Sequence, residues 1–114
     1  MNINVQNEDA IYLGYIYEDE LSAIGNIYIE NNEMWIGDFE VSKFKTHKRI
    51  GRLFFNAILE EFSNYSTITL TYLDTAARLF WEKMGFIGND KNKIMTLDMN
   101  KKQIYESMMA KVAV

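Results

Sequence analysis

Asp38 and Glu40 are candidates for proton-transfer chemistry because both belong to one predicted strand, residues 34–41. Side chains two residues apart on a strand point to the same face, so the two carboxylates share a face and Phe39 and Val41 share the other. If Phe39 and Val41 face the core, either carboxylate can take a proton from a substrate, directly or through water. The alternative is that both carboxylates are solvated on an open sheet face.

The charges of the chain are strongly segregated. The net charge is −4, but residues 1–42 hold nine acidic and no basic side chains, and residues 43–114 hold twelve basic against seven acidic. Five of the basic residues lie between Lys43 and Arg52. This basic segment suits phosphate groups and the acidic first third suits a cationic substrate, although a solubilising surface beside a charged loop is the alternative. Net acidity disfavours general nucleic-acid binding, and −4 is too little charge for an acidic mimic of nucleic acid.

Composition excludes several classes of protein. A chain of 114 residues without proline or linker-like segments predicts one domain over residues 1–114. Without cysteine it cannot form disulfides, cysteine-based zinc sites or cysteine nucleophiles, and its one histidine, His47, would have to serve any serine–histidine–aspartate triad. We expect no metal site. With no signal-like start and no apolar run near the ~20 residues of a membrane span, we expect a cytoplasmic protein without membrane contact.

The apolar periodicity predicts the element order β-β-β-α-β-α-β followed by a helical tail. Strands are expected at residues 10–17, 22–30, 34–41, 67–72 and 93–99, with a short additional strand at 3–5, and helices at 50–62, at 75–84 and from 100 onward. Asn31-Asn32 indicates a hairpin, residues 88–90 a turn, and Asn100 with Gln103 resembles a capping box for the tail helix. The tail carries an apolar stripe, Ile104, Tyr105, Met108, Met109 and Val112, which we expect to pack on the domain or on a second copy, giving a homodimer.

The segment from Asp74 to Phe86 carries the most distinctive pattern of the chain. Asp74 can cap a helix, an apolar face follows, and Gly85 can end the helix in a left-handed conformation before Phe86 turns inward. This segment resembles the second signature of the GNAT acetyltransferases, roughly Asn-x-x-Ala-x-x-Leu/Phe-Tyr-x-Lys-x-Gly-Phe. The motif positions are occupied by Asp74, Ala77, Phe80, Trp81, Lys83, Gly85 and Phe86.

The predicted element order is similar to the GNAT fold from its second strand onward. The resemblance therefore implies an α/β (α+β) fold, with a mixed, largely antiparallel sheet and a helix on either face. Family members usually place two helices between the first and second strands, where this chain has only about four residues. We expect a minimal GNAT-like domain that lacks those two helices, with a core at 10–99 and the tail at 100–114.

The resemblance assigns acetyl-CoA as co-substrate and a loop that holds its pyrophosphate. In the family this loop reads Gln/Arg-x-x-Gly-x-Gly/Ala, and its glycines and the free N–H groups of the following helix approach the phosphates. Here Thr46 and Arg49 replace the leading residue and the first glycine, whereas Ile50 and Gly51 are retained. The cofactor-binding residues implied in this way are Val41, Lys43, Thr46, His47, Lys48, Arg49, Ile50, Gly51, Arg52, Asp74 and Trp81. The alternatives are a charged loop that binds no ligand and, for Asp74, a plain helix cap.

Trp81 replaces the family tyrosine, which is often the general acid for the departing thiolate. An indole N–H cannot protonate a thiolate, so Trp81 can only donate a hydrogen bond, stack on pantetheine or fill the core. Tyr72, at the end of the preceding strand, is a substitute acid outside the family pattern. Asp38 and Glu40 would then take the proton of the amine that attacks the thioester.

These features predict an acetyl-CoA-dependent N-acetyltransferase that acts on a primary amine, either a protein lysine or a polyamine. Its partners would be CoA and that acceptor. Gly51, Lys48 and the Asp38/Glu40 pair favour this enzyme. Thr46 and Arg49 favour the alternative, a catalytically decayed GNAT-fold module that acts through protein–protein interaction.

Overall fold

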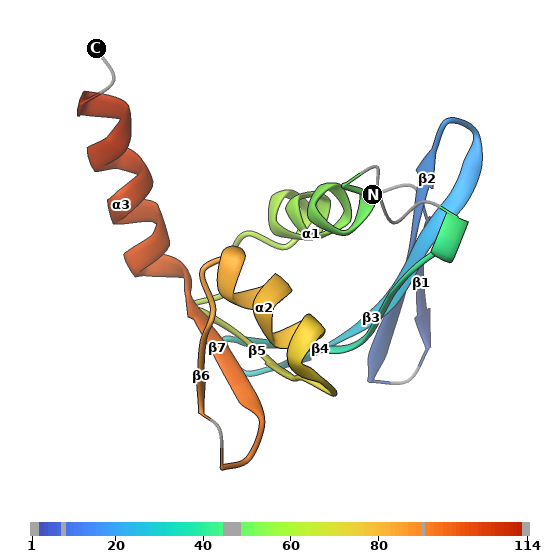
Figure 1. Cartoon of the computed structure of the whole chain (residues 1–114), viewed down its shortest axis with the longest axis horizontal. Coiled ribbons are helices and arrows are strands. Elements are labelled where there is room, and N and C mark those ends of the chain that lie inside the picture. The colour runs from blue at the N-terminus through green and yellow to red at the C-terminus, as the bar shows by residue number, and fades with distance from the viewer. Residues whose placement is uncertain (1–2, 8, 45–48, 90, 113–114) are drawn as a thin grey trace.

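The computed structural model describes residues 3–7, 9–44, 49–89 and 91–112. These ranges form one sheet of seven strands in the order β1-β2-β3-β4-β5-β7-β6, with three helices (Figure 1). The elements are β1 (Ile3–Asn7), β2 (Ala10–Tyr17), β3 (Glu20–Glu30), β4 (Glu33–Val41), α1 (Ile50–Glu61), β5 (Thr67–Thr71), α2 (Thr75–Lys83), β6 (Ile87–Asn89), β7 (Ile94–Asp98) and α3 (Met99–Val112). Neighbouring strands are antiparallel except β4 and β5, which are parallel, so the predicted mixed, largely antiparallel sheet is confirmed.

Two tight hairpins order the first half of the sheet. Glu18 and Asp19, with φ angles of 51° and 65°, turn β2 into β3 in the left-handed conformation that a two-residue hairpin requires. Asn31, with φ of 57°, begins the turn from β3 into β4, as the Asn31-Asn32 pair predicts. Only residues 8 and 9 separate β1 from β2, too few for a helix.

A β-bulge changes the face that β4 presents. The pairing of β3 with β4 shifts between Gly25 and Ile27, which lie opposite Phe39 and Ile36, so two residues of β4 oppose Asn26 alone. An extra residue reverses the alternation of side chains along the bulged strand. Phe39 therefore faces the same side as Ile36, although the two residues are an odd number of positions apart.

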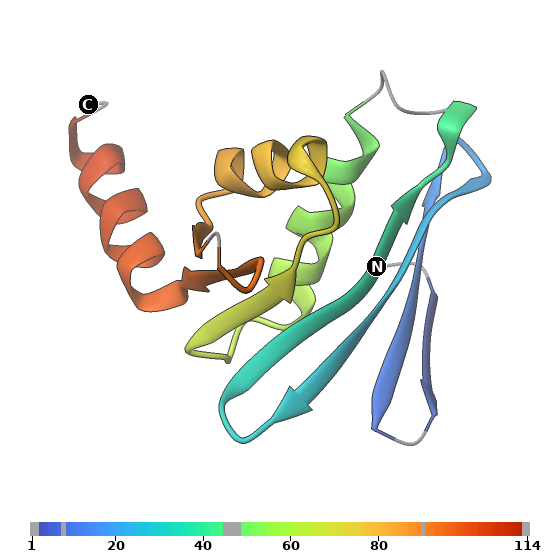
Figure 2. The ribbon, with the colours of Figure 1, turned by 60° about the horizontal axis from the view of Figure 1, so that its bottom comes forward.

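Helices α1 and α2 cover the same face of the sheet. The Phe39 ring stacks on Phe54 of α1 at a centroid distance of 4.9 Å and lies 4.8 Å from the ring of Trp81 in α2. A strand residue points to only one face, and Figure 2 shows both helices on one side of the strands. The expectation of a helix on either face was therefore wrong: the two helices build one aromatic core with β4.

The opposite face of β2, β3 and β4 carries no helix from the described part of the chain. Tyr12, Ile24 and Tyr28 are 41–47% exposed there, and Trp35 lies directly across from Tyr28. We call this side the open face.

The tail helix α3 begins earlier than the sequence indicates. The carboxylate of Asp98 accepts a hydrogen bond from the Lys101 N–H at 3.0 Å, and the helix starts at Met99. The predicted capping box at Asn100 and Gln103 was wrong, because Asp98, the last residue of β7, supplies the cap. None of the helices within the described ranges is long and apolar enough to cross a membrane.

Candidate functional site

The strands β4 and β5 diverge at the end of the sheet nearest the basic segment. Their parallel pairing runs from Glu33 with Thr67 to Ile36 with Leu70, and β4 then continues to Val41 without a β5 partner. Such a separation leaves one side of the β4 main chain available for hydrogen bonds to a ligand. Val41 lies at the end of this separated segment, where the sequence places it.

The first turn of α1 has the uncapped backbone donors and the positive charge that favour an anion. Arg49 is the N-cap residue, in the left-handed conformation with φ of 57° and ψ of 28°, and its carbonyl accepts the Leu53 N–H at 3.1 Å. The N–H groups of residues 50–52 have no acceptor within the helix, and the first turn contains neither a side-chain cap nor an acidic residue. Arg49 and Arg52 are exposed beside them. These amides, the helix dipole and the two guanidinium groups all favour negative charge.

Gly51 brings the start of α1 against both β4 and α2. A Cβ on Gly51 would lie 3.1 Å from the Phe80 ring and 3.5 Å from the Val41 side chain, closer to the ring than a methyl group normally packs. The glycine therefore joins Val41 to the helix start, as the resemblance implies. It also brings Phe80, half-buried in α2, to the start of α1; the sequence places Phe80 in the second signature but carries no signal that its ring contacts Gly51.

Both ends of α2 form as the sequence predicts. The Asp74 carboxylate accepts the Ala77 N–H at 2.8 Å, which is the plain helix cap considered above. At the other end Gly85, with φ of 101°, donates to Glu82, and Phe86 donates to the Trp81 carbonyl and is buried. This double hydrogen bond is the Schellman motif.

Trp81 fills the core between the two helices. It is 5% exposed, and its ring lies 4.8–5.3 Å from the centroids of four phenylalanine rings. The four are Phe39, Phe55, Phe80 and Phe86. Of the roles open to Trp81, packing is the one for which the structure shows contacts. A role beside pantetheine stays a prediction.

Asp38 and Glu40 share the open face, opposite Phe39, which agrees with the alternative of solvated carboxylates; their role as proton acceptors stays a prediction. Both are exposed, and Asp38 is held by the buried amide of Asn26. Glu40 lines a cavity of about 220 Å³ together with Ser22 and Ser42. Sequence patterns carry no signal for Asn26, because its contact with Asp38 depends on the pairing of two strands.

The structure separates the acid candidate from the base candidates. Tyr72 follows β5, is 8% exposed and belongs to the core on the helix side, with the Arg78 guanidinium 5.9 Å from its ring centroid. Glu40 lies on the opposite side of the sheet. Within the described ranges, no three His, Cys, Asp or Glu side chains are grouped to hold a metal ion.

Residues 45–48 of the basic segment lie outside the described residues, and they include the predicted site residues Thr46, His47 and Lys48. Of the remainder, Lys43 lies two residues after the end of β4, and its exposed ammonium lies 5.3 Å from the Phe44 ring centroid. Ile50 is fully buried beneath the start of α1. The described cations therefore flank both ends of the loop that connects β4 to α1.

Comparison with known proteins places this arrangement in a family. The model of the acetyltransferase (GNAT) family matches residues 2–86. No curated protein sequence matches the chain.

Several solved acetyltransferase structures have the same fold. The ribosomal-protein-S18-alanine N-acetyltransferase of Escherichia coli aligns with a TM-score of 0.68 and 16% identity, over 82% of this chain and 72% of that one. PaiA N-acetyltransferase of Thermoplasma acidophilum, in complex with coenzyme A, gives 0.63 and 21%, over 79% and 61%. Tetrahymena GCN5 gives 0.69 and 11%, over 82% and 70%. The family match covers most of the chain and the fold agrees with it, so this protein belongs to the GNAT family of acetyltransferases.

Proposed function

We propose that the protein transfers an acetyl group from acetyl-CoA to a primary amine, on a protein lysine or a polyamine. The observation that carries the proposal is the start of α1 at the divergence of β4 from β5. There, uncapped helix amides and two arginines lie next to Gly51 and Val41. This is the position and chemistry that a CoA pyrophosphate needs.

The residues present fit the coenzyme. Its pyrophosphate would accept hydrogen bonds from the N–H groups of residues 50–52, with Arg49 and Arg52 as counter-charges. Its pantetheine arm would follow the separated part of β4, residues 37–41, on the helix side of the sheet. The bound coenzyme supplies a thioester, and the gap between β4 and β5 would give that thioester access to the open face.

The open face suits a large or extended cationic acceptor. No helix from the described ranges covers it to enclose a small metabolite, and it presents acidic residues beside exposed aromatic rings. Asp38 or Glu40 would accept the proton of the acceptor ammonium, which makes its nitrogen a nucleophile. The new N–C bond then forms as the C–S bond breaks, and CoA leaves as a thiolate that takes its proton from solvent.

A second candidate function is a GNAT-fold binding module without turnover. Trp81 occupies the position of the family tyrosine, so that tyrosine is not present to protonate the thiolate. Trp81 is instead buried among four rings, which favours the binding module. The separation of Tyr72 from Glu40 by the sheet favours it further. Loss of the acid alone leaves a slower enzyme, since general acid catalysis contributes about 10²–10⁴-fold.

Acetyl transfer to polylysine and spermine distinguishes the two functions. Glu40→Gln and Asp38→Asn each remove one proton acceptor, and at least one of them should slow transfer by about 10²–10⁴-fold. Glu33→Gln is the matched control, because Glu33 is exposed at the far end of the same strand. If the native protein binds CoA but transfers acetyl to neither acceptor, the binding module is correct. Equal rates in all four proteins would remove both carboxylates from the mechanism.

A further inference from the structure

The tail helix α3 leaves most of its apolar surface uncovered. It continues from β7 and projects away from the edge of the sheet opposite β1 (Figure 1). Its α3 stripe, defined as the four large apolar side chains that are 55–68% exposed, consists of Ile104, Tyr105, Met108 and Met109. A helix of 14 residues is only marginally stable in water without a packing partner. The stripe therefore indicates a missing contact surface.

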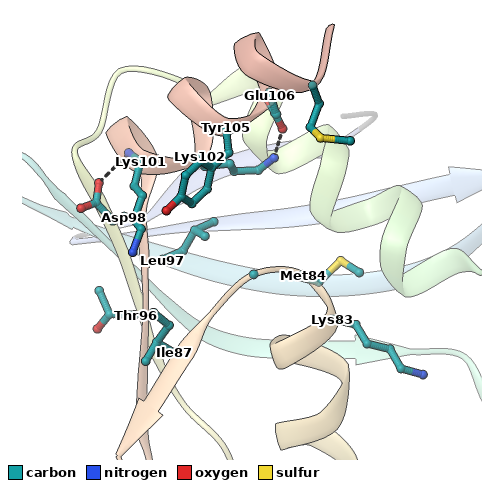
Figure 3. A pocket seen from close by; sticks show the side chains of 12 residues that line it. Lys83, Met84, Ile87, Thr96, Leu97, Asp98, Lys101, Lys102, Tyr105 and Glu106 are labelled. Atoms are coloured by element: carbon teal, nitrogen blue, oxygen red, sulfur yellow. Dashed lines mark hydrogen bonds and ion pairs between the residues drawn. The ribbon is translucent and has the colours of Figure 1, made fainter. Parts of the chain in front are cut away.

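An apolar groove runs beside this stripe. Its volume is about 740 Å³, and Met84, Ile87 and Leu97 line it on the side of the sheet and α2. Tyr105 and Met109 line it from α3, with lysines along the rim (Figure 3). Because these two residues belong to both features, the stripe and the groove form one continuous apolar surface.

The start of α3 is fixed to the domain. Asp98 caps the helix, Met99 is 6% exposed, and the Met99 N–H donates to the Ser66 carbonyl at 3.0 Å. These contacts set the direction in which α3 leaves the sheet. The helix cannot fold down into its own groove without breaking them, so the groove stays open to another chain.

The spacing of the stripe is self-complementary. Its positions are symmetric about the midpoint between Glu106 and Ser107, so in an antiparallel pair of α3 helices Ile104 lies across from Met109 and Tyr105 across from Met108. The same contacts recur on both sides of a two-fold axis, which is what an isologous dimer interface requires. The Lys102–Glu106 ion pair lies beside the stripe and also lines the groove, so it would stand at the edge of the interface.

We propose that α3 is a dimerisation helix. The α3 stripes of two copies pack antiparallel on each other. Each α3 helix then also covers the groove of the other copy. The proposal is independent of acetyl transfer, because none of these residues belongs to the candidate coenzyme or acceptor site.

Sedimentation equilibrium tests the proposal directly. The full chain should have twice the 13.4 kDa mass of one copy at about 100 µM, where a micromolar dissociation constant gives mostly dimer. Met108→Glu should raise that constant at least tenfold. Gln103→Glu, which adds the same charge on the opposite side of the helix, should leave it unchanged. A monomeric native chain at this concentration, or equal effects of the two variants, would overturn the proposal.

Disulfide trapping tests the orientation of the helices, and it is free of background because the chain has no cysteine. A mixture of Ile104→Cys and Met109→Cys proteins should cross-link under mild oxidation, whereas neither should cross-link with itself. In the antiparallel pair each residue is offset along the axis by about 7.5 Å from its own equivalent, at 1.5 Å per residue. Self-linking of each single variant would indicate parallel helices and contradict the proposed interface.

Discussion

Asn26 and Asp38 hold each other across the bulge between β3 and β4. The Asn26 Oδ1 accepts the Asp38 backbone N–H at 2.8 Å, and its Nδ2 donates to the Asp38 Oδ2 at 3.3 Å. The amide fits only because Gly37 has no side chain, since a Cβ there would collide with the Asn26 Oδ1. The buried Asn26 amide thus accepts the backbone N–H of the bulge and restrains the carboxylate of Asp38, a candidate base. It lies at the bulge that turns Phe39 toward the helices.

Asn26→Asp should destabilise the fold without changing its shape. The variant keeps an oxygen for the Asp38 N–H but loses the donor and places a second carboxylate beside Asp38. We expect urea denaturation at neutral pH to show a loss of about 1–2 kcal/mol in the free energy of unfolding. Asn32→Asp, in an exposed turn, is the charge-matched control and should cost less. An equal loss of stability in both variants would contradict this prediction.

Replacing Arg49 separates its backbone strain from its charge. Residue 49 occupies the left-handed region, where a residue with a side chain is disfavoured by about 1–2 kcal/mol and glycine is not. Arg49→Gly should therefore be more stable than Arg49→Ala by about 1 kcal/mol in chemical denaturation. Both variants should bind CoA more weakly than the native chain, because both lack the guanidinium. Equal stability of the two variants would contradict the prediction, because it would show that the left-handed conformation of residue 49 carries no backbone strain.

Trp81→Tyr should act on the core. The smaller ring leaves part of the space among the four phenylalanines empty, which we expect to cost about 1–2 kcal/mol in the free energy of unfolding. Trp35→Tyr, on the half-buried open face, should cost less. Acetyl transfer should not accelerate, because the new phenol would point into the core. A faster reaction would instead place residue 81 beside the thioester sulfur.

The sequence predicted those parts of the fold whose causes are local. Strand β2 has the predicted bounds because a β-branched and aromatic run ends at turn residues. Helix α2 has the predicted ends because Asp74 and Gly85 act on their own neighbourhood. By contrast, residues 88–90 were expected to be a turn, and Ile87–Asn89 forms the edge strand β6 by pairing with β7. That pairing depends on residues outside the segment.

The same distinction applies to the candidate site. The motif placed Val41 and Gly51 together, and strand alternation placed Asp38 and Glu40 on one face. Neither pattern could reveal Asn26, which lies twelve residues from its partner Asp38, because the bulge arises only when β3 and β4 pair. Nor could periodicity decide which side of the sheet each helix covers, since an apolar helix face packs equally well on either.

Calorimetric titration with acetyl-CoA tests whether the start of α1 holds the coenzyme. We expect saturable binding with one coenzyme per chain. In a variant with Lys48→Glu and Arg49→Glu, affinity should fall at least tenfold, because two positive charges of the basic segment become negative, while the melting temperature stays within a few degrees. Gln103→Glu in α3 should bind like the native chain. Absence of binding by the folded native protein at millimolar acetyl-CoA, or unchanged affinity in the charge-reversed variant, would contradict the account.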